Sequence, residues 1–441
     1  MYRYLILSLF LFHFIFGKSQ NDTCLYNLEL GISFPPVSDV TQRTFTLGHL
    51  NALGVSKIRF AEEWASREPI QGSFNWQPLD QRIAWADSNN IEILLTIQSN
   101  GPAWACSSIQ NPQSCVFNDN NEFKVYLDSL LDRYSGKIDK IQFGNEWQGD
   151  FWYAGSAAQF VTSNNVLYQA VQDYSPSTQV VLGGFTSRSL ALMAACNGDV
   201  SYFYDEDGYF VSQAQIQSDC GLQQYQDIFA RIDSVLSMAN YDIIDLHLYD
   251  EVERWDEYYY SFSDTITKPI LVSEFGGPNT NYEPDTYTFQ ENRIYEYIKK
   301  LDSIGIQEGY FFRLVEGSSN LAHVNSGLID DTTFLEKPSY YVFQKFNDCQ
   351  LGFEEPSLQT SLCEFYPNPV SSEMKVMTKN SDIIIRKIMI YDLTGKQIHV
   401  QTNQLQSGIS LDFSNISSGS FVLKIVYSND FVETQKIIVQ R

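Results

Sequence analysis

Two glutamates stand near the ends of short apolar runs, where a carboxylate could do chemistry. Glu146 lies in KIQFGNEW at residues 140–147, and Glu274 lies in PILVSEFG at residues 269–276. A buried carboxylate is costly unless it has a partner or a task. Two carboxylates facing one cleft can cleave a glycosidic bond, because one protonates the leaving oxygen while the other attacks or stabilises the sugar carbon. The alternative is that either glutamate is a surface or salt-bridged residue.

The elements that would position these glutamates repeat along most of the chain. From residue 28 to about residue 347, apolar runs alternate with loops and amphipathic stretches, which is typical of βα units around a parallel sheet. The predicted strands are residues 28–34, 57–63, 91–98, 138–144, 179–185, 243–249, 269–275 and 308–314. The predicted helices include residues 78–89, 122–134, 156–174, 223–238 and 287–303.

Eight such units predict an α/β fold, a (β/α)₈ TIM barrel. A doubly wound open sheet is the competing fold, but it would need a Gly-rich phosphate loop after the first strand. The sequence GISFPPVS at residues 31–38 does not supply one. In the barrel, Glu146 follows the fourth strand and Glu274 ends the seventh, so both would lie at the carboxyl ends of the strands, where such barrels place catalytic groups.

In these features the chain resembles the clan A glycoside hydrolases, which are retaining enzymes. The resemblance rests on Asn145-Glu146 at strand four, Glu274 at strand seven and the strand count, and it covers roughly residues 25–347. It implies that Glu146 is the acid/base and Glu274 the nucleophile in double displacement on β-linked oligo- or polysaccharides, with no metal and no organic cofactor. The alternatives are a cell-surface barrel that binds glycan without cleaving it, and a secreted adhesin or structural protein.

The resemblance also implies roles for residues around the two glutamates. Arg59, at the end of strand two, would help hold Glu274 ionised. Asn145 would hold the sugar 2-hydroxyl. His247 and Tyr249 leave strand six on one side, so the tyrosine would donate to the nucleophile and the histidine would help position the sugar. The alternatives are a structural ion pair for Arg59 and a satisfied core position for His247.

Aromatic residues in the loops after strands three and four are candidate platforms for stacking on sugars, with core burial as the alternative. They are Trp104, Trp147, Trp152 and Tyr153. Clan members usually offer a tryptophan at the end of strand eight, but residues 309–316 read GYFFRLVE. Phe312, Arg313 or Glu316 must therefore act differently there. Glu62 and Glu63 end strand two, and for them we expect a surface position or a contact with a sugar hydroxyl.

Composition excludes some classes of partner and indicates export. The chain has 53 acidic and 29 basic residues, for a net charge of −24, which argues against a nucleic-acid or anionic-membrane partner. Residues 1–20 have the layout of a secretory signal peptide, and no later segment is long and apolar enough to span a bilayer. Export permits disulfides among the seven cysteines, and Cys106 with Cys115 or Cys196 with Cys220 would each close a short loop. No Cys or His spacing supports a structural zinc site.

The end of the chain has a different pattern. After a barrel domain over residues 21–349, residues 350–363 are predicted to be a linker and residues 364–441 a small β-sandwich. This tail resembles the C-terminal sorting domain of type IX secretion through YPNP at 366–369, YDLTGK at 391–396 and GSF at 419–421. The resemblance implies that the type IX secretion machinery is a partner. It also implies export through the periplasm and outer membrane to a secreted or cell-surface location.

Overall fold

The computed structural model describes two compact units, Met1–Gly352 and Phe353–Arg441, which are considered separately. The described residues are 28–111, 114–204, 208–249, 251–264, 266–281, 283–318, 321–348, 363–379, 384–392, 397–406, 409–427 and 432–440. The predicted signal peptide, nearly all of the predicted linker, Cys24 and Cys349 lie outside these ranges.

The first unit is a closed barrel of eight parallel strands in the order β1-β12-β11-β10-β7-β6-β3-β2. The strands are β1 (Glu29–Ser33), β2 (Lys57–Glu62), β3 (Glu92–Ile97), β6 (Lys140–Phe143), β7 (Gln179–Thr186), β10 (Ile243–Leu248), β11 (Ile270–Phe275) and β12 (Glu308–Phe311). Each coincides with a predicted strand, so the predicted barrel is confirmed.

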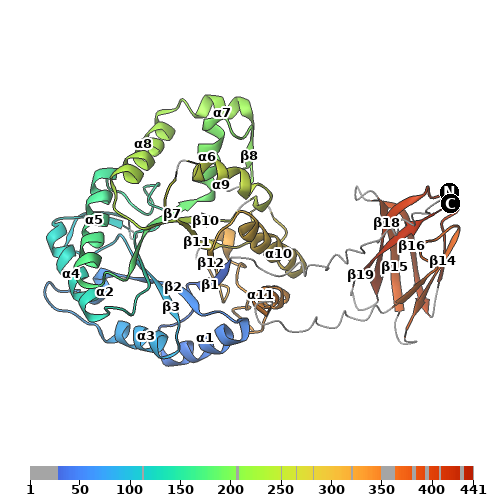
Figure 1. Cartoon of the computed structure of the whole chain (residues 1–441), viewed down its shortest axis with the longest axis horizontal. Helices are drawn as coiled ribbons and strands as arrows, with labels where there is room; N and C mark the ends of the chain where they lie inside the picture. The colour runs from blue at the N-terminus through green and yellow to red at the C-terminus, as the bar shows by residue number, and fades with distance from the viewer. Residues whose placement is uncertain are drawn as a thin grey trace, which may run out of the picture. The chain divides into compact units, whose positions relative to one another are not determined.

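Helices surround the barrel strands (Figure 1). They are α1 (Val40–Leu53), α2 (Trp64–Arg67), α3 (Gln77–Ser88), α4 (Asn120–Arg133), α5 (Ala157–Tyr174), α6 (Ser187–Asn197), α7 (Gln213–Asp219), α8 (Gln223–Met238), α9 (Trp255–Ser263), α10 (Tyr287–Ser303) and α11 (Pro338–Asp348). None of these helices, within the ranges that the structure covers, is both long and apolar enough to cross a lipid bilayer.

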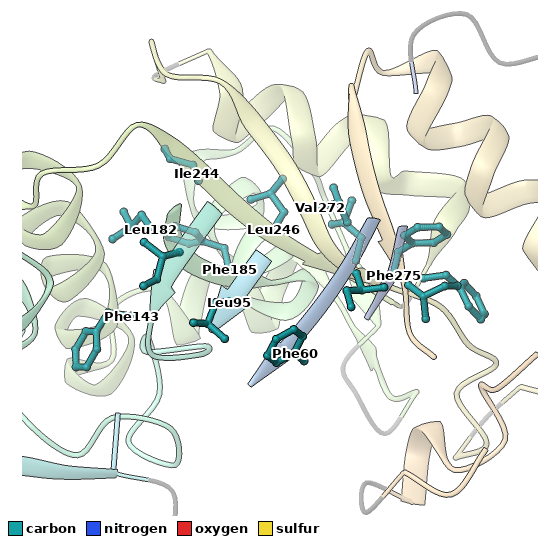
Figure 2. Packing of buried hydrophobic residues seen from close by; sticks show 14 of the residues in the cluster. Phe60, Leu95, Phe143, Leu182, Phe185, Ile244, Leu246, Val272 and Phe275 are labelled. Carbon is teal, nitrogen blue, oxygen red and sulfur yellow. The ribbon is translucent and has the colours of Figure 1, made fainter. Parts of the chain in front are cut away.

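The main core lies between the strands and the helices. Alternate strand residues such as Phe60, Leu95 and Phe143 are almost wholly buried there, and Figure 2 shows them beside apolar residues of the neighbouring strands. Fully burying one such side chain contributes about 1.5–3 kcal/mol. This layer makes the barrel a rigid support for groups at its rim.

Inside the barrel, an apolar layer supports a polar one. Leu94, Val181, Ile243, Leu271 and Tyr310 form a buried cluster. Side chains alternate along a strand, so the residues two positions further on face the same side. At the carboxyl ends these include Thr96, Asp245 and Ser273, and all three are buried. The interior thus changes from apolar to polar at the depth where the predicted site begins.

Two disulfides close loops of the barrel unit. Cys106 and Cys115 join the hairpin of β4 (Cys106–Asn111) and β5 (Ser114–Phe117), which follows β3. Cys196 and Cys220 link the end of α6 to the residue after α7, around β8 (Phe203–Tyr204) and β9 (Phe210–Val211). Both pairings were among those that the sequence suggested. Closing a loop covalently typically stabilises a fold by about 2–4 kcal/mol.

The second unit is a β-sandwich of two antiparallel sheets, as predicted. One sheet has the order β13-β14-β17 and the other β16-β15-β18-β19. The strands are β13 (Cys363–Tyr366), β14 (Glu373–Thr378), β15 (Ile384–Asp392), β16 (Gln397–Gln406), β17 (Ile409–Asp412), β18 (Gly419–Tyr427) and β19 (Val432–Val439). Met374, Ile388, Leu411 and Leu423 are buried in a core of its own, so this unit has what an independent domain needs.

Candidate active site

A cavity of about 790 Å³ lies at the carboxyl ends of the barrel strands. Both predicted catalytic residues, Glu146 and Glu274, line it. The other lining residues are Phe34, Ala61, Thr96, Gln98, Ser99, Asn145, Phe151, Trp152, Thr186, Ser187, Tyr249, Asn279, Asn281, Phe312, Arg313, Ser318, Ala322 and His323. The volume is in the range of small-molecule sites, and most of these polar groups offer hydrogen bonds without charge.

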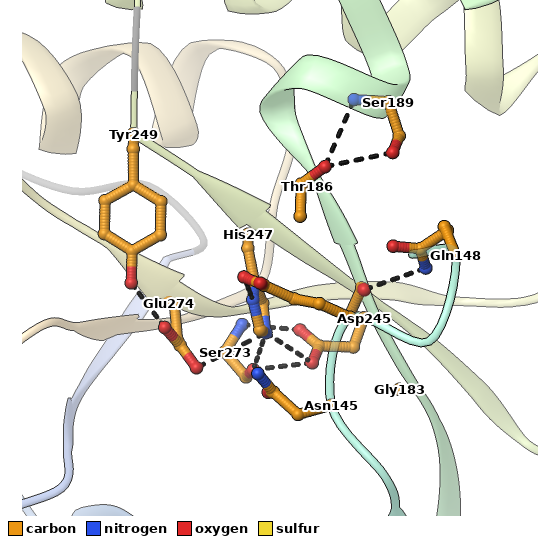
Figure 3. Close-up of polar contacts among 12 residues, drawn as sticks. Asn145, Gln148, Gly183, Thr186, Ser189, Asp245, His247, Tyr249, Ser273 and Glu274 are labelled. Atoms are coloured by element: carbon orange, nitrogen blue, oxygen red, sulfur yellow. Dashed lines mark hydrogen bonds and ion pairs between the residues drawn. The ribbon is translucent and has the colours of Figure 1, made fainter. Parts of the chain in front are cut away.

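Glu146 and Glu274 lie close together across the buried ring of His247. One carboxylate oxygen of each glutamate and one ring nitrogen of His247 all lie within 4.8 Å of one another. Nδ1 of His247 lies 2.7 Å from Oε1 of Glu146, and Nε2 lies 3.6 Å from Oε1 of Glu274. Figure 3 shows His247 between the polar groups of this cluster. The Glu146 side chain is 21% exposed and that of Glu274 only 7%, so the first is the more accessible.

Glu274 is held as a carboxylate. Arg59 donates from Nη1 to Oε1 of Glu274. The Tyr249 hydroxyl donates to Oε2 of Glu274 (Figure 3). Burial alone would raise the pKa of Glu274, but the charges of His247 and Arg59 and the hydrogen bonds from Tyr249 and Arg59 outweigh it and lower that pKa. Burial, together with the negative charge of Glu274, raises the pKa of Tyr249 well above its usual range, so the hydroxyl keeps its proton. An ionised, buried carboxylate suits a nucleophile.

His247 carries a positive charge beneath the cavity. Nε2 also lies 3.2 Å from Oδ2 of Asp245 and 3.1 Å from the Ser273 hydroxyl, so both ring nitrogens face acceptors. Burial would lower the pKa of His247, but the charges of Glu274 and Asp245 and the hydrogen bonds to Asp245 and Glu146 raise it to about 10. The side chain is fully buried and does not line the cavity. The structure therefore places His247 in the satisfied core position that we gave as the alternative, in contact with Glu146.

Asp245 was missed by the sequence reasoning. It is fully buried, and its carboxylate accepts hydrogen bonds from the backbone N–H of Ser273 at 2.7 Å and from the Ser273 hydroxyl at 2.6 Å. The signal was present in the run DLHLY, because Asp245, His247 and Tyr249 alternate along β10 and a buried aspartate demands partners.

We predict that His247 stays protonated far above the usual range of histidine. Its pKa is raised from 6.5 to about 10 on folding, so protonation stabilises the folded state fully below pH 6.5, and this contribution is lost as the pH rises through 10. The free energy of unfolding in urea should therefore fall more steeply between pH 7 and 10.5 in the wild type than in His247→Asn. The pKa of His49 is lowered by burial, so His49→Asn is the control and should follow the wild-type slope. Equal slopes for the wild type and His247→Asn would contradict the assignment.

The backbone at Glu146 has an uncommon conformation. Its φ is +39°, in the left-handed region that non-glycine residues rarely occupy, at a cost of about 1–3 kcal/mol. The next two side chains fasten this turn to β7, since Nε1 of Trp147 donates to the Gly183 carbonyl at 2.8 Å and Nε2 of Gln148 donates to the Gly184 carbonyl at 3.0 Å. A Cβ at Gly184 would lie 2.1 Å from Nε2 of His247, so only glycine leaves room for the imidazole.

Trp147 is therefore not a sugar platform. Its side chain is fully buried and packs on Phe160, with the ring centroids 5.0 Å apart. Trp104 does not line the cavity either, because its Nε1 donates to the Glu68 carbonyl and its ring packs edge-on against Trp64 at 5.4 Å. Core burial, the alternative to stacking on a sugar, therefore applies to Trp147 and to Tyr153, which is 2% exposed, while Trp104 lies outside the cavity lining.

Aromatic residues do line the rim after β6. Trp152 lines the cavity as expected, and Phe151, which the sequence reasoning passed over, lines it with a side chain that is 62% exposed. Phe312, which follows β12, also lines the cavity, and its ring centroid lies 5.8 Å from that of Tyr249 and 6.0 Å from that of Phe34. These rings offer apolar faces to a ligand.

Arg59 acts from below the cavity. It is fully buried and is absent from the lining, and it lies beside Glu274 as predicted. Its Nη2 donates to Oδ1 of Asn145 at 2.8 Å and its Nε donates to the Thr96 hydroxyl at 3.0 Å. Gln142 continues the polar layer by donating to Asp245 at 3.2 Å. Asn145 lines the cavity, as does Tyr249.

Two other glutamates have structural roles. Glu62, which we expected at the surface or at a sugar hydroxyl, is 2% exposed and pairs with Arg67 and Arg82, so that expectation is wrong. Glu316 pairs with the buried ammonium of Lys337. Both glutamates thus satisfy internal cations.

Glu146, His247 and Glu274 form a grouping whose ligand atoms are near enough to share a cation. A protonated imidazole has no lone pair to donate to a metal, and His247 and Arg59 already bring positive charge to the two carboxylates. The arrangement therefore fits proton transfer and nucleophilic attack better than metal binding.

Comparison with known proteins agrees with this architecture. Residues 364–440 match the secretion system C-terminal sorting domain family. The fold resembles a family 39 glycoside hydrolase from Bacteroides cellulosilyticus WH2, with 12% identity, a TM-score of 0.51, and coverage of 95% of this chain and 82% of that one. It also resembles an exo-β-1,4-mannosidase from Opitutaceae bacterium strain TAV5, with 14% identity, a TM-score of 0.51, and coverage of 74% of this chain but only 60% of that one.

No curated protein sequence matches the chain significantly. At 12–14% identity, the structural likenesses show the fold. The sorting domain marks the protein for type IX secretion to the cell surface or beyond. The chain is thus an exported protein that joins a (β/α)₈ barrel to a C-terminal secretion system sorting domain.

Proposed function

We propose that the protein is a retaining glycoside hydrolase that cleaves β-linked glycans outside the cell. The observation that carries this proposal is the pair of carboxylates, Glu146 and Glu274, whose nearest ligand oxygens lie within 4.8 Å in one cavity. Carboxyl groups are about 5–5.5 Å apart in retaining enzymes and about 6.5–9.5 Å apart in inverting ones, which need room for a water. The short separation supports double displacement.

In the first step, a carboxylate oxygen of Glu274 attacks the anomeric carbon while Glu146 protonates the departing glycosidic oxygen. The bond from the sugar to the leaving group breaks and a covalent glycosyl ester forms on Glu274. The depressed pKa of Glu274 keeps the attacking group ionised. Arg59 and Tyr249 orient it through both oxygens.

In the second step, Glu146 takes a proton from water, and the water oxygen attacks the same anomeric carbon from the side that the leaving group vacated. The ester bond breaks, Glu274 is released as a carboxylate, and the sugar leaves with its original configuration. His247 holds Oε1 of Glu146 throughout, which leaves the other oxygen to carry the proton.

The lining of the cavity supports a neutral sugar ring in this reaction. Asn145 lines the cavity and its carbonyl oxygen already accepts from Arg59, so we assign its amide NH₂ to the sugar 2-hydroxyl. Trp152 and Phe151 offer faces for a sugar on the leaving-group side. Asn279, Asn281 and Gln98 add uncharged hydrogen-bonding groups.

The test is hydrolysis of a panel of β-glycans by the purified barrel, followed by proton NMR of the first product. We expect reducing sugar to appear in the β configuration before it mutarotates. A product that appears first as the α anomer would disprove the retaining mechanism. Tight binding of a glycan without any cleavage would favour the alternative, a cell-surface barrel that binds glycan.

We also predict that the β-sandwich is dispensable for catalysis. Since it has its own core and engages the type IX secretion machinery in our proposal, deleting residues 364–441 should leave hydrolysis by the purified protein intact and stop export in the native host. Activity is measured on the purified proteins, and export by immunoblot of the culture fractions. If the truncated protein has a native circular dichroism spectrum but no activity, the domain boundary is wrong.

A further inference from the structure

The end of strand eight brings one arginine to the wall of the cavity. Arg313 directly follows Phe312, and both line the cavity together with Glu274 and Tyr249. Among the lining residues in the described ranges, Arg313 is the single arginine or lysine. It stands at the position where the sequence departs from the usual strand-eight pattern, so it belongs to this chain's own version of the site.

Arg313 is poorly satisfied by the protein. Its Nε is buried without a hydrogen-bond partner, and its Nη1 donates to the Gly317 carbonyl at 3.5 Å, the outer limit for a hydrogen bond. No carboxylate in the described part of the chain forms an ion pair with it, whereas Arg59, Arg82 and Arg293 each pair with at least one. Burial accordingly lowers the pKa of Arg313, with the charge of Asp331 acting in the opposite direction. Such a guanidinium presents unused donors to a ligand.

The neighbours of Arg313 place it on the nucleophile side of the cavity. The Tyr249 ring lies 5.8 Å from that of Phe312 and 4.3 Å from that of His323, while its hydroxyl donates to Glu274. The segment that carries Phe312, Arg313 and His323 therefore walls the place that the attacked sugar would occupy. A substituent on that sugar would then lie in the same cavity as the guanidinium, which lines it.

An anionic sugar would need such a cation. The cavity already holds the carboxylates of Glu146 and Glu274, and the protein carries a net charge of −24, so an added negative charge is repelled unless a cation compensates it locally. Arg59 is committed to Glu274, and His247 to Glu146 and Asp245. The planar guanidinium of Arg313 matches the oxygens of a carboxylate or a sulfate.

We propose that Arg313 binds an anionic oxygen group, the carboxylate of a uronic acid or a sulfate ester, on the sugar that Glu274 attacks. This inference rests on the proposed hydrolase function and makes anionic β-glycans its substrate class. Arg313 is a specificity-determining residue in this assignment, and it takes no part in proton transfer.

The test compares each anionic glycan with its own neutral derivative. Uronate-bearing β-glycans are used native and after chemical reduction of their carboxyl groups, and sulfated β-glycans are used native and after desulfation, so the two arms distinguish the two sources of charge. The measured quantity is the ratio of kcat/KM on the native glycan to that on the neutral derivative. We expect a ratio well above one for the wild type in one arm.

Replacing Arg313 with glutamine should lower that ratio roughly ten- to a hundredfold, because a hydrogen bond to a charged group is lost. Arg313→Lys keeps the positive charge but lacks the planar guanidinium, so it should retain part of the preference for the anionic glycan. If Arg313→Gln does not fold, the ratio measured for Arg313→Lys tests the role of Arg313 in its place. Arg133→Gln removes an exposed arginine that pairs with Asp80 and should leave the ratio unchanged. Raising the salt concentration should lower the wild-type ratio more than that of Arg313→Gln.

A higher wild-type kcat/KM on the neutral derivative than on the native glycan, in both arms, would overturn the proposal. So would an Arg313→Gln variant that loses kcat/KM equally on the anionic glycan and on its neutral derivative. In either case, hydrolysis itself would still stand. If the wild type cleaves nothing, the hydrolase function fails, and calorimetric titration of the same pairs into the wild type and Arg313→Gln decides the role of Arg313 separately. Tighter binding of the anionic member, lost in the variant, would then support the assignment, and equal binding would refute it.

Discussion

Replacing Glu274 with alanine is expected to abolish hydrolysis of natural glycans and of activated aryl glycosides alike. Every turnover in the proposed mechanism passes through the ester on this residue, so a good leaving group cannot compensate for its loss. Removing a nucleophile from a hydrolase costs on the order of a millionfold in kcat. The measurement is the initial rate on both kinds of substrate, with azide added at high concentration. Azide should yield at most a glycosyl azide of inverted configuration.

Two controls separate chemistry from folding in the Glu274 experiment. Glu274→Ala leaves the buried charge of Arg59 without its carboxylate and removes one of the carboxylates around His247, and breaking a buried pair costs about 3–5 kcal/mol. Glu274→Gln keeps the volume and should be equally inactive, and thermal unfolding shows how much of each variant is folded. Glu63→Ala removes a glutamate outside the cavity lining and should retain wild-type rates. Turnover by folded Glu274→Gln would rule out the nucleophile assignment.

Replacing Glu146 with alanine should have a different signature, because the acid matters most when the leaving group is poor. On natural glycans we expect a loss of roughly a hundred- to ten-thousandfold, the usual contribution of a general acid. An activated aryl glycoside should still react with Glu274, so the first step survives and the glycosyl ester accumulates. The pre-steady-state burst of the aryl leaving group measures this accumulation.

Azide provides the second half of the Glu146 test. Its small anion needs no general base, so it should enter the space left by the missing side chain and release the glycosyl ester as a product of retained configuration. The configuration is read by NMR, and Glu274→Ala treated in parallel is the matched control. If Glu146→Ala lost activity equally on natural glycans and on the aryl glycoside, and azide had no effect on its rate, Glu146 would not be the acid/base.

The barrel could be predicted from the sequence because its strands are buried on both faces. Runs such as those of β3 and β11 are apolar nearly throughout, as parallel strands covered by helices must be, and their spacing leaves room for one helix each. The two glutamates were found for the same reason, since a carboxylate at the end of such a run stands out. Alternation within β10 likewise put His247 and Tyr249 on one side of the strand.

The errors concern features that depend on contacts distant in sequence. Nothing local shows that the backbone adopts a left-handed conformation at Glu146, after which Trp147 is buried in the core instead of lining the cavity. Glu62 was expected at the surface or at a sugar hydroxyl because its partners Arg67 and Arg82 cannot be recognised from the sequence. The buried Nε of Arg313, which has no hydrogen-bond partner, is equally invisible in the chain, because hydrogen bonding is a property of the folded packing.

The buried cations of this site suggest why both steps of the proposed mechanism can proceed without any rearrangement of the buried side chains. Arg59 and His247 are positive, and Asp245 and Glu274 are negative. In the proposed mechanism Glu146 enters the first step protonated, so these five groups together are electroneutral. When the glycosyl ester forms, Glu274 loses its charge and Glu146 gains one as its proton departs. The sum remains zero, and the charge moves from one side of the imidazolium to the other. In the low-dielectric interior, one negative charge therefore changes its position, and these groups never carry a net charge.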